Sequence, residues 1–221
     1  MRDRLDRLKE ALPGCNVSAV ILGAPRLAWA EGPTGQEHEV VEKARHTFLR
    51  LQETIPSAYA AELVTRLPRL LLRDFATRLE PQLRFVRSAF EGADVGYLLH
   101  QNPALLTRSI EASLRPRLAL LRSFFPGISA ENLTSLVGGN QELWALPESA
   151  LTSRIAELEA LVPRESILPI LIRHPRSWTA DLEEVVGPQT RLLRSCLSEE
   201  TVQQVIIKLP SALYYPPALL Q

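Results

Sequence analysis

Apolar and polar positions along this chain follow a repeating pattern. A proline followed by apolar residues recurs along the sequence, and a glutamine takes its place once. These positions are Pro25, Pro68, Pro103, Gln141, Pro175 and Pro210. Their successive separations are 43, 35, 38, 34 and 35 residues, and such a period is typical of solenoid proteins. The sequence therefore predicts repeats of about 35 residues, the first enlarged by a loop at residues 32–35.

A second pattern keeps the same period about 13 residues later. Its clearest copies begin at Pro81, Pro116 and Pro188, and each ends in Arg-Ser six residues on. Residues 44–51 and 153–160 are more divergent copies. Apolar residues recur at helical spacing in these stretches, and a proline in the first turn of a helix forfeits no hydrogen bond. The pattern therefore predicts helices that begin at the three prolines.

Other residues mark further helix starts and stops. Ser129 and Ser198 each precede apolar residues at helical spacing, so both are expected to cap helices. Pro169 is tolerated in a first turn if Glu165 or Ser166 is the cap. The recurrent prolines of the first pattern force the preceding residue out of the helical region, and the few residues after them suit a short 3₁₀ turn.

Each predicted repeat is thus a helix, a 3₁₀ turn and a second helix, and neither helix alone can bury its apolar face. Stacking buries these faces, so the sequence predicts an all-α fold, an α-solenoid without paired strands. We expect a single domain over 1–221. Its repeats span about 16–53, 57–91, 94–127, 129–162 and 165–197, with partial repeats at 1–14 and 198–221.

One position of the 3₁₀ turn is apolar in successive repeats. It holds Leu71, Leu106, Trp144 and Trp178. A residue that shares its place with leucines is expected to pack in the core, so burial of the two tryptophans is favoured over stacking on bases.

Charge is balanced overall and uneven along the chain. There are 25 basic and 25 acidic residues, but residues 63–125 hold ten arginines against five acids. Arginine outnumbers lysine by 22 to three, which suits bidentate binding of phosphate or carboxylate, although a compositional bias toward arginine is an equal alternative. The uncharged stretches are too short to cross a bilayer, so we expect no membrane contact.

Two rows of arginines are the candidate nucleic-acid-binding residues. The first is predicted to form a ladder of one arginine per repeat on the helices of the second pattern, with Glu159 in one repeat. Its members are Arg50, Arg87, Arg122 and Arg194. The second row follows the recurrent prolines at Arg26, Arg69 and Arg176, and the ladder helices add Arg84 and Arg117. Phosphate contact and pairing with acids are both open for the ladder; packing or pairing is favoured for the second row.

No pattern in the sequence supports catalysis or a cofactor. The four histidines have no metal-binding spacing, and Cys15 and Cys196 have no CxxC partner. Neither a phosphate-binding glycine loop nor a nucleophile with a spaced base is present. We therefore expect a protein that is not an enzyme, with no catalytic residue, metal or cofactor.

The combination of the two patterns resembles the mitochondrial transcription termination factor (mTERF) family. The closest stretches are Asn102-Pro-Ala-Leu-Leu, residues 114–129 and His174-Pro-Arg-Ser-Trp, and the resemblance extends from about Asn16 to Pro210. It implies two antiparallel helices and a 3₁₀ helix per repeat, wound into a left-handed superhelix. This chain differs from strongly basic family members in its zero net charge, and one repeat has Gln141 and Glu159 where proline and arginine stand elsewhere.

The resemblance also implies a function. Family members bind nucleic acid, chiefly double-stranded DNA, and serve transcription termination, transcript maturation or ribosome assembly in mitochondria or chloroplasts. We accordingly expect a monomer that binds duplex DNA, with RNA as a further ligand. Two alternatives stay open. The first is a solenoid that binds a partner protein, and the second is a repeat protein that reads single-stranded RNA one base per repeat.

Overall fold

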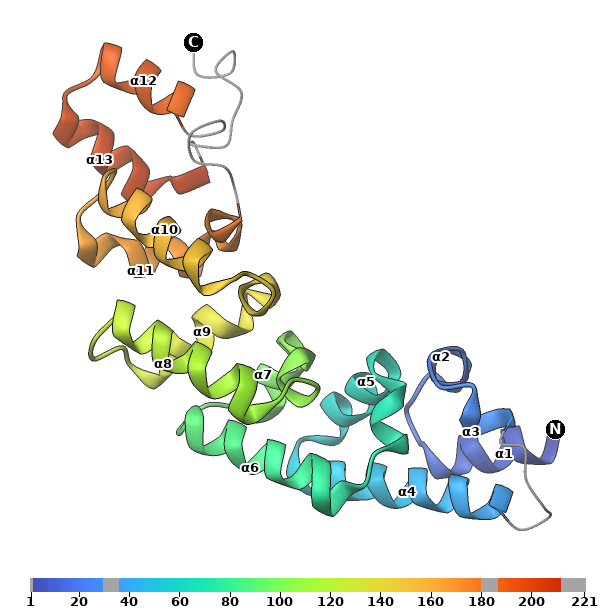
Figure 1. The fold of residues 1–221 in the computed structure, drawn as a ribbon. Helices are drawn as coiled ribbons and strands as arrows, with labels where there is room; N and C mark the ends of the chain where they lie inside the picture. Colours follow the sequence, from blue (N-terminus) through green and yellow to red (C-terminus); the bar gives the residue numbers. More distant parts are fainter. Residues whose placement is uncertain (1, 30–35, 180–186, 212–221) are drawn as a thin grey trace. The chain divides into compact units, whose positions relative to one another are not determined.

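The computed structural model describes residues 2–29, 36–179 and 187–211. No residue in these ranges lies in a β-strand, and helices and short turns make up almost all of them (Figure 1). The predicted all-α helical repeat fold is therefore confirmed. No helix within the described ranges is long and apolar enough to span a membrane.

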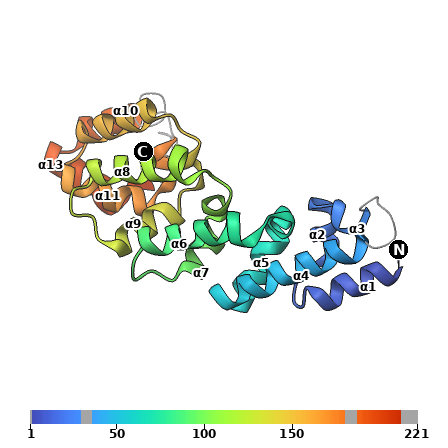
Figure 2. The same ribbon diagram turned by 60° about the horizontal axis from the view of Figure 1, so that its bottom comes forward.

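The chain divides into two compact units, residues 1–110 and 111–221. The helices of the N-terminal unit are α1 (Arg2–Ala11), α2 (Val17–Gly23), α3 (Arg26–Trp29), α4 (Gln36–Thr54), α5 (Ser57–Arg66), η1 (Pro68–Leu72), η2 (Phe75–Leu79), α6 (Glu80–Ala89), α7 (Val95–Gln101) and η3 (Pro103–Leu106). Within this unit α4 and α6 lie along one side, and α2 and α5 lie along the other (Figures 1 and 2). The single domain predicted over 1–221 stays a prediction.

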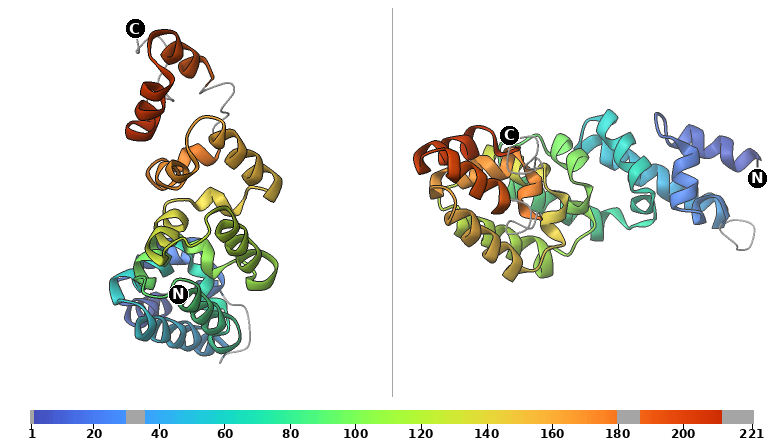
Figure 3. Two further views of the ribbon diagram at one scale, coloured as in Figure 1. Left: turned by 90° about the vertical axis from the view of Figure 1, so that its left-hand side faces the viewer. Right: turned by 90° about the horizontal axis from the view of Figure 1, so that it is seen from above.

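The C-terminal unit continues the same alternation. The π-turn η4 (Ile110–Leu114) leads into it, and its helices are α8 (Arg115–Phe124), α9 (Ala130–Gly138), η5 (Gln141–Trp144), α10 (Glu148–Glu159), α11 (Arg164–Arg173), η6 (Pro175–Trp178), α12 (Gly187–Cys196) and α13 (Glu199–Lys208). Helices α8 and α10 lie on one side of this unit, and α9 and α11 lie on the other (Figure 3, left).

The buried residues repeat with the predicted period. In α4 and the residue after it they are Ala44, Phe48, Leu51 and Ile55. The same four positions recur 35 residues later at Leu79, Leu83, Val86 and Phe90, and again at Leu114, Leu118, Leu121 and Phe125. The α10 segment repeats them at Leu151, Ile155, Leu158 and Val162. Each helix therefore contributes the same apolar stripe to a core that continues through successive repeats within a unit.

Short 3₁₀ helices lie at four of the predicted turns, η1, η3, η5 and η6. The turn after Pro25 is the four-residue α-helix α3 instead, and the turn that begins at Pro210 lies mostly outside the described residues. Their shared apolar position is buried throughout, with 0% exposure at Leu71, 1% at Leu106, 3% at Trp144 and 2% at Trp178. The predicted packing role of both tryptophans is confirmed.

The predicted helix starts at Pro81, Pro116 and Pro188 are confirmed, because α6, α8 and α12 each begin one residue before the proline, but two of these helices follow an additional turn that the sequence did not indicate. A five-residue π-turn, η2 or η4, precedes α6 or α8 without a break, and each proline is the second residue of its α-helix. A proline inside a helix lacks an N–H and its ring clashes with the carbonyl four residues earlier. The wider π-turn before it relieves both problems. The corresponding helix α10 has Ser153 at the equivalent position, its nearest proline, Pro147, precedes the first residue of the helix as the N-cap, and no π-turn leads into it.

Polar caps begin several helices as the sequence indicates. The Oγ atoms of Ser129 and Ser198 accept hydrogen bonds from the backbone N–H groups of Asn132 (3.2 Å) and Thr201 (3.3 Å), which confirms both predicted caps. The expectation for Pro169 is wrong, because α11 already begins at Arg164 after Pro163 and places Pro169 at its sixth position. This proline therefore removes one hydrogen bond from the helix interior.

Candidate nucleic-acid interface

The predicted arginine ladder lies on four helices, α6, α8, α10 and α12. On each helix the ladder position comes one residue after an apolar position of the core-facing stripe. Arg87 follows Val86, and Arg122, Glu159 and Arg194 occupy the same place in later repeats. In α4 the residue after the buried Leu51 is Gln52, so Arg50 lies two residues out of register and its predicted place in the ladder is wrong. The sequence match misled because it aligned Leu49, which is 45% exposed, with a core position.

Three of the candidate arginines are paired with carboxylates. Nη1 of Arg50 lies 2.6 Å from Oε2 of Glu53, and the guanidinium also stacks over the Phe75 ring at 5.3 Å from its centroid. Arg84 lies 3.8 Å from Glu80, one turn away on α6. The third pair joins Arg194 to Glu199. Each of these positive charges is balanced by a neighbouring negative charge.

The Arg194 pair has the best geometry of the three. Its Nε and Nη2 atoms each donate to one carboxylate oxygen of Glu199 at 2.8 Å. These hydrogen bonds raise the pKa of Arg194 and lower the pKa of Glu199. A phosphate that approached Arg194 would have to displace this carboxylate, which makes the residue a poor phosphate ligand.

A second group of arginines donates to backbone carbonyls of a neighbouring repeat. Arg87 Nη2 donates to the Thr54 carbonyl oxygen at 2.7 Å, and Arg117 Nη2 to that of Leu146 at 2.5 Å. The same kind of bond joins Arg66 to His100, Arg73 to Leu106 and Arg164 to Phe124. Arg164 is also ion-paired with Glu159. A carbonyl group has no net charge, so the bond of Arg87 to Thr54 leaves the charge of that guanidinium group in place. The inter-repeat bonds also account for part of the excess of arginine over lysine, because guanidinium offers five donors in a rigid fork.

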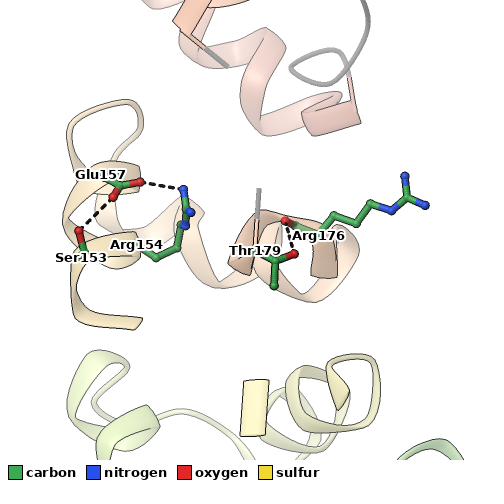
Figure 4. A network of polar contacts seen from close by, with 5 residues as sticks. All are labelled: Ser153, Arg154, Glu157, Arg176 and Thr179. Carbon is green, nitrogen blue, oxygen red and sulfur yellow. Dashed lines mark hydrogen bonds and ion pairs between the residues drawn. The ribbon is translucent and has the colours of Figure 1, made fainter. Parts of the chain in front are cut away.

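The row of arginines on the proline-led turns has no such partners. The exposed guanidinium groups of Arg69 on η1 and Arg176 on η6 make no hydrogen bond or ion pair with any residue in the described part of the chain. Figure 4 shows the Arg176 side chain extending away from its turn, while Thr179 Oγ1 donates only to the backbone carbonyl of Arg176. The pairing expected for this row is therefore not found, and the exposed Arg26 on α3 behaves in the same way.

The sequence interpretation missed a polar position that, in two repeats, forms hydrogen bonds to the next repeat. It lies one residue before a position of the core-facing stripe and contains Thr47, Gln82, Arg117, Arg154 and Gln189. Gln82 Nε2 donates to the carbonyl oxygens of Leu105 (2.6 Å), within the next 3₁₀ turn, and Arg108 (2.9 Å), just after it. Arg117 donates to Leu146, which is the equivalent of Arg108 one repeat later. We call this set the staple position. It could have been found in the sequence as a polar residue that recurs with the same spacing as the core positions.

The staple position removes Arg117 from the candidate interface, because its side chain is partly buried between repeats. In the next repeat Arg154 is 12% exposed, and its Nη1 donates to Glu157 Oε2 at 2.7 Å, while Ser153 Oγ donates to the other carboxylate oxygen at 3.0 Å (Figure 4). Among the predicted site residues, Arg69, Arg87 and Arg176 therefore remain as exposed arginines without a carboxylate partner among the described residues.

The repeated unit of a helix, a proline-led 3₁₀ turn and a second helix, with the same core positions in each copy, defines a helical repeat protein. The family model for mTERF matches residues 51–220, most of the chain, and the protein belongs to the mTERF family. No curated protein gives a match to the sequence. The family consists of nucleic-acid-binding repeat proteins that are typically organellar, and it is not known for enzymes.

Proposed function

We propose that this protein binds duplex DNA through Arg69, Arg87 and Arg176, and that it regulates transcription termination or transcript processing in mitochondria or chloroplasts. One observation carries the choice of residues. These three arginines are exposed and have no carboxylate partner among the described residues, whereas Arg50, Arg84 and Arg194 are each paired with a glutamate.

A free guanidinium group is suited to phosphate because its planar donors match two phosphate oxygens at once. One nitrogen of Arg87 donates a hydrogen bond to the Thr54 carbonyl oxygen, and the guanidinium group keeps its full charge. The bond therefore orients the side chain without neutralising it. Contacts of this kind attach a protein to the DNA backbone and carry no sequence information. We therefore expect weak binding of any duplex, with a Kd on the order of 10⁻⁴ to 10⁻⁶ M near physiological salt.

The segment 63–125 contributes the positive excess, and Arg69 and Arg87 lie within it. Both belong to the N-terminal unit, which has 15 basic residues against 13 acidic ones, whereas the C-terminal unit has ten against 12. Binding is therefore expected to depend mainly on the N-terminal unit.

Replacing Arg69 and Arg87 together with glutamine is expected to flatten the dependence of log K on log salt by about 1.8, because each lost phosphate contact removes about 0.9 from the slope. Fluorescence anisotropy with a labelled duplex of about 20 base pairs, titrated between about 50 and 200 mM salt, measures this slope. The matched control replaces Arg50 and Arg84 with glutamine in the same unit. It removes the same charge but takes it from carboxylate pairs, so less than half of that change is expected.

Equal slopes for the two double variants would show that DNA binding depends only on the net charge of the protein. They would contradict the assignment of Arg69 and Arg87 as phosphate contacts. Absence of duplex binding at about 50 mM salt would contradict DNA binding altogether, because even a few neutralised phosphates give detectable affinity there. Tighter binding to a single-stranded RNA than to any duplex would favour the RNA alternative.

A further inference from the structure

Helices α5 and α7 of the N-terminal unit carry a cluster of aromatic rings beside a carboxylate. The Tyr59 and Tyr97 rings meet edge to face with centroids 6.4 Å apart, and the His100 ring lies 5.4 Å from Tyr59. Tyr97 is 48% exposed. Nδ1 of His100 lies 3.2 Å from Oε2 of Glu62, whose side chain is 50% exposed. We call these four residues the tyrosine cluster.

The repeat itself does not require this cluster. Counted from the proline-led turn, Tyr97 stands where other repeats have Glu62, Ser135 or Pro169, and all of these positions are exposed. The place of His100 is taken by Thr65, Gly138 and Ile172 in the other repeats. Core positions, by contrast, keep the same chemical type from repeat to repeat. Residues that packing does not dictate, and that expose large amphipathic rings, are typical of binding surfaces.

The backbone holds the cluster in a fixed geometry. A Cβ atom at Gly96 would lie 2.7 Å from Pro56 Cδ and 2.8 Å from Tyr59 Cδ2, so glycine at this position lets the Tyr59 ring lie directly against α7. Arg66 Nη1 donates to the His100 carbonyl oxygen at 2.5 Å and ties the end of α5 to α7. The rings are thereby preorganised, which lowers the entropy lost when a ligand binds.

A groove adjoins the cluster on the other side of α5. It has a volume of about 540 Å³ and lies between the α1–α2 turn, the end of α4 and α5. Its walls include Pro13, Ala58 and Ala61, and Glu62 is its one ionisable lining residue. Apart from Nδ1 of His100, no side-chain nitrogen of a described arginine, lysine or histidine lies within 4 Å of the Glu62 carboxylate. Glu62 therefore belongs to both the groove and the cluster and keeps acceptor capacity toward solvent.

We propose that the tyrosine cluster and this groove bind a segment of a partner protein that inserts an arginine or lysine side chain beside Glu62. The cation meets the carboxylate and the tyrosine ring faces, which attract cations through their quadrupoles. Apolar residues that flank the cation occupy the groove. The same carboxylate repels phosphate, so this surface is distinct from the proposed DNA-binding arginines and does not depend on them.

The test is a titration of the full-length ¹⁵N-labelled protein, followed by the chemical shifts of its backbone amides. The probes are the acetylated, amidated tripeptides Leu-Arg-Leu and Leu-Gln-Leu. We expect the arginine peptide to shift the amides of Glu62, Tyr97 and His100 and to bind about tenfold more tightly than the glutamine peptide, the difference that a charge-assisted hydrogen bond typically contributes.

Two substitutions sharpen the test. Glu62→Gln is expected to remove the preference for the arginine peptide, whereas Glu91→Gln, an exposed glutamate elsewhere in the same unit, is expected to leave it unchanged. Tyr97→Ala is expected to weaken binding of the arginine peptide. Unchanged dispersion of the remaining amide signals confirms that each variant is folded.

Equal affinity for the two peptides, or shifts that map away from α5 and α7, would overturn the proposal. So would a stronger response of the same amides to a single-stranded oligothymidine, which would identify the tyrosines as a base-stacking surface. The double variant at Arg69 and Arg87 serves to separate the two proposals, because it is expected to show the flattened salt dependence of DNA binding and to keep peptide binding.

Discussion

Replacing Trp178 with alanine is expected to lower the free energy of unfolding by about 3 to 5 kcal/mol. The side chain is 2% exposed and fills the position of η6 that leucine fills in η1 and η3. Truncation removes its buried apolar surface and leaves a cavity that neighbouring repeats cannot fully close. Trp178→Leu introduces the residue that η1 and η3 have at this position and is expected to cost less than the alanine variant.

Urea denaturation followed by far-ultraviolet circular dichroism measures this effect. Trp29→Ala is the control, because Trp29 is 55% exposed and its loss is expected to change the free energy of unfolding by no more than about 0.5 kcal/mol. A cost below about 1 kcal/mol for Trp178→Ala, together with lost nucleic-acid binding, would instead assign this tryptophan to a functional surface.

Gln82→Leu is expected to cost about 2 to 4 kcal/mol, because two carbonyl oxygens, those of Leu105 and Arg108, lose their shared donor at a buried junction between repeats. Leucine has similar bulk, so the loss comes mainly from the unsatisfied polar atoms. Denaturation measures the cost, and faster hydrogen exchange of the amides in η3 localises it.

Gln204→Leu on α13 is the matched control, because Gln204 is exposed and makes no hydrogen bond to the described residues. Its effect is expected to stay within about 0.5 kcal/mol. If the two variants were equally stable, the staple position would contribute nothing beyond its apolar stem, and the cohesion between repeats would come from the core alone.

The period of the apolar residues was sufficient to predict the fold. Spacing alone predicts the core positions from Ala44 onward, the short turns and the burial of Trp144 and Trp178. Each helix has one hydrophobic stripe, and stacking of the repeats buries it. Ser129 and Ser198 were predictable as caps for a local reason, since a capping bond joins residues three apart.

The partners of the arginines were only partly predictable. The pairs of Arg50 with Glu53 and Arg84 with Glu80 join residues three and four apart on one helix and can be found from spacing. The bond from Arg87 to the Thr54 carbonyl cannot, because it depends on how neighbouring repeats pack, and a backbone acceptor leaves no trace in the sequence. The π-turns before Pro81 and Pro116 were not predicted, because a proline in the first turn of an α-helix accounts for the same sequence without a π-turn.

The bonds from arginine to backbone carbonyls have a consequence for how such a protein evolves. A carbonyl group is present at every residue, so no mutation on the acceptor side can delete the partner of Arg87, Arg73 or Arg66. After a duplication, two neighbouring repeats can diverge at nearly every sequence position while a retained arginine still bonds one repeat to the other. Divergent copies such as residues 44–51 and 153–160 are what this tolerance allows. Selection then acts on the few donors at each junction and leaves the exposed surface of each copy free to acquire new ligands.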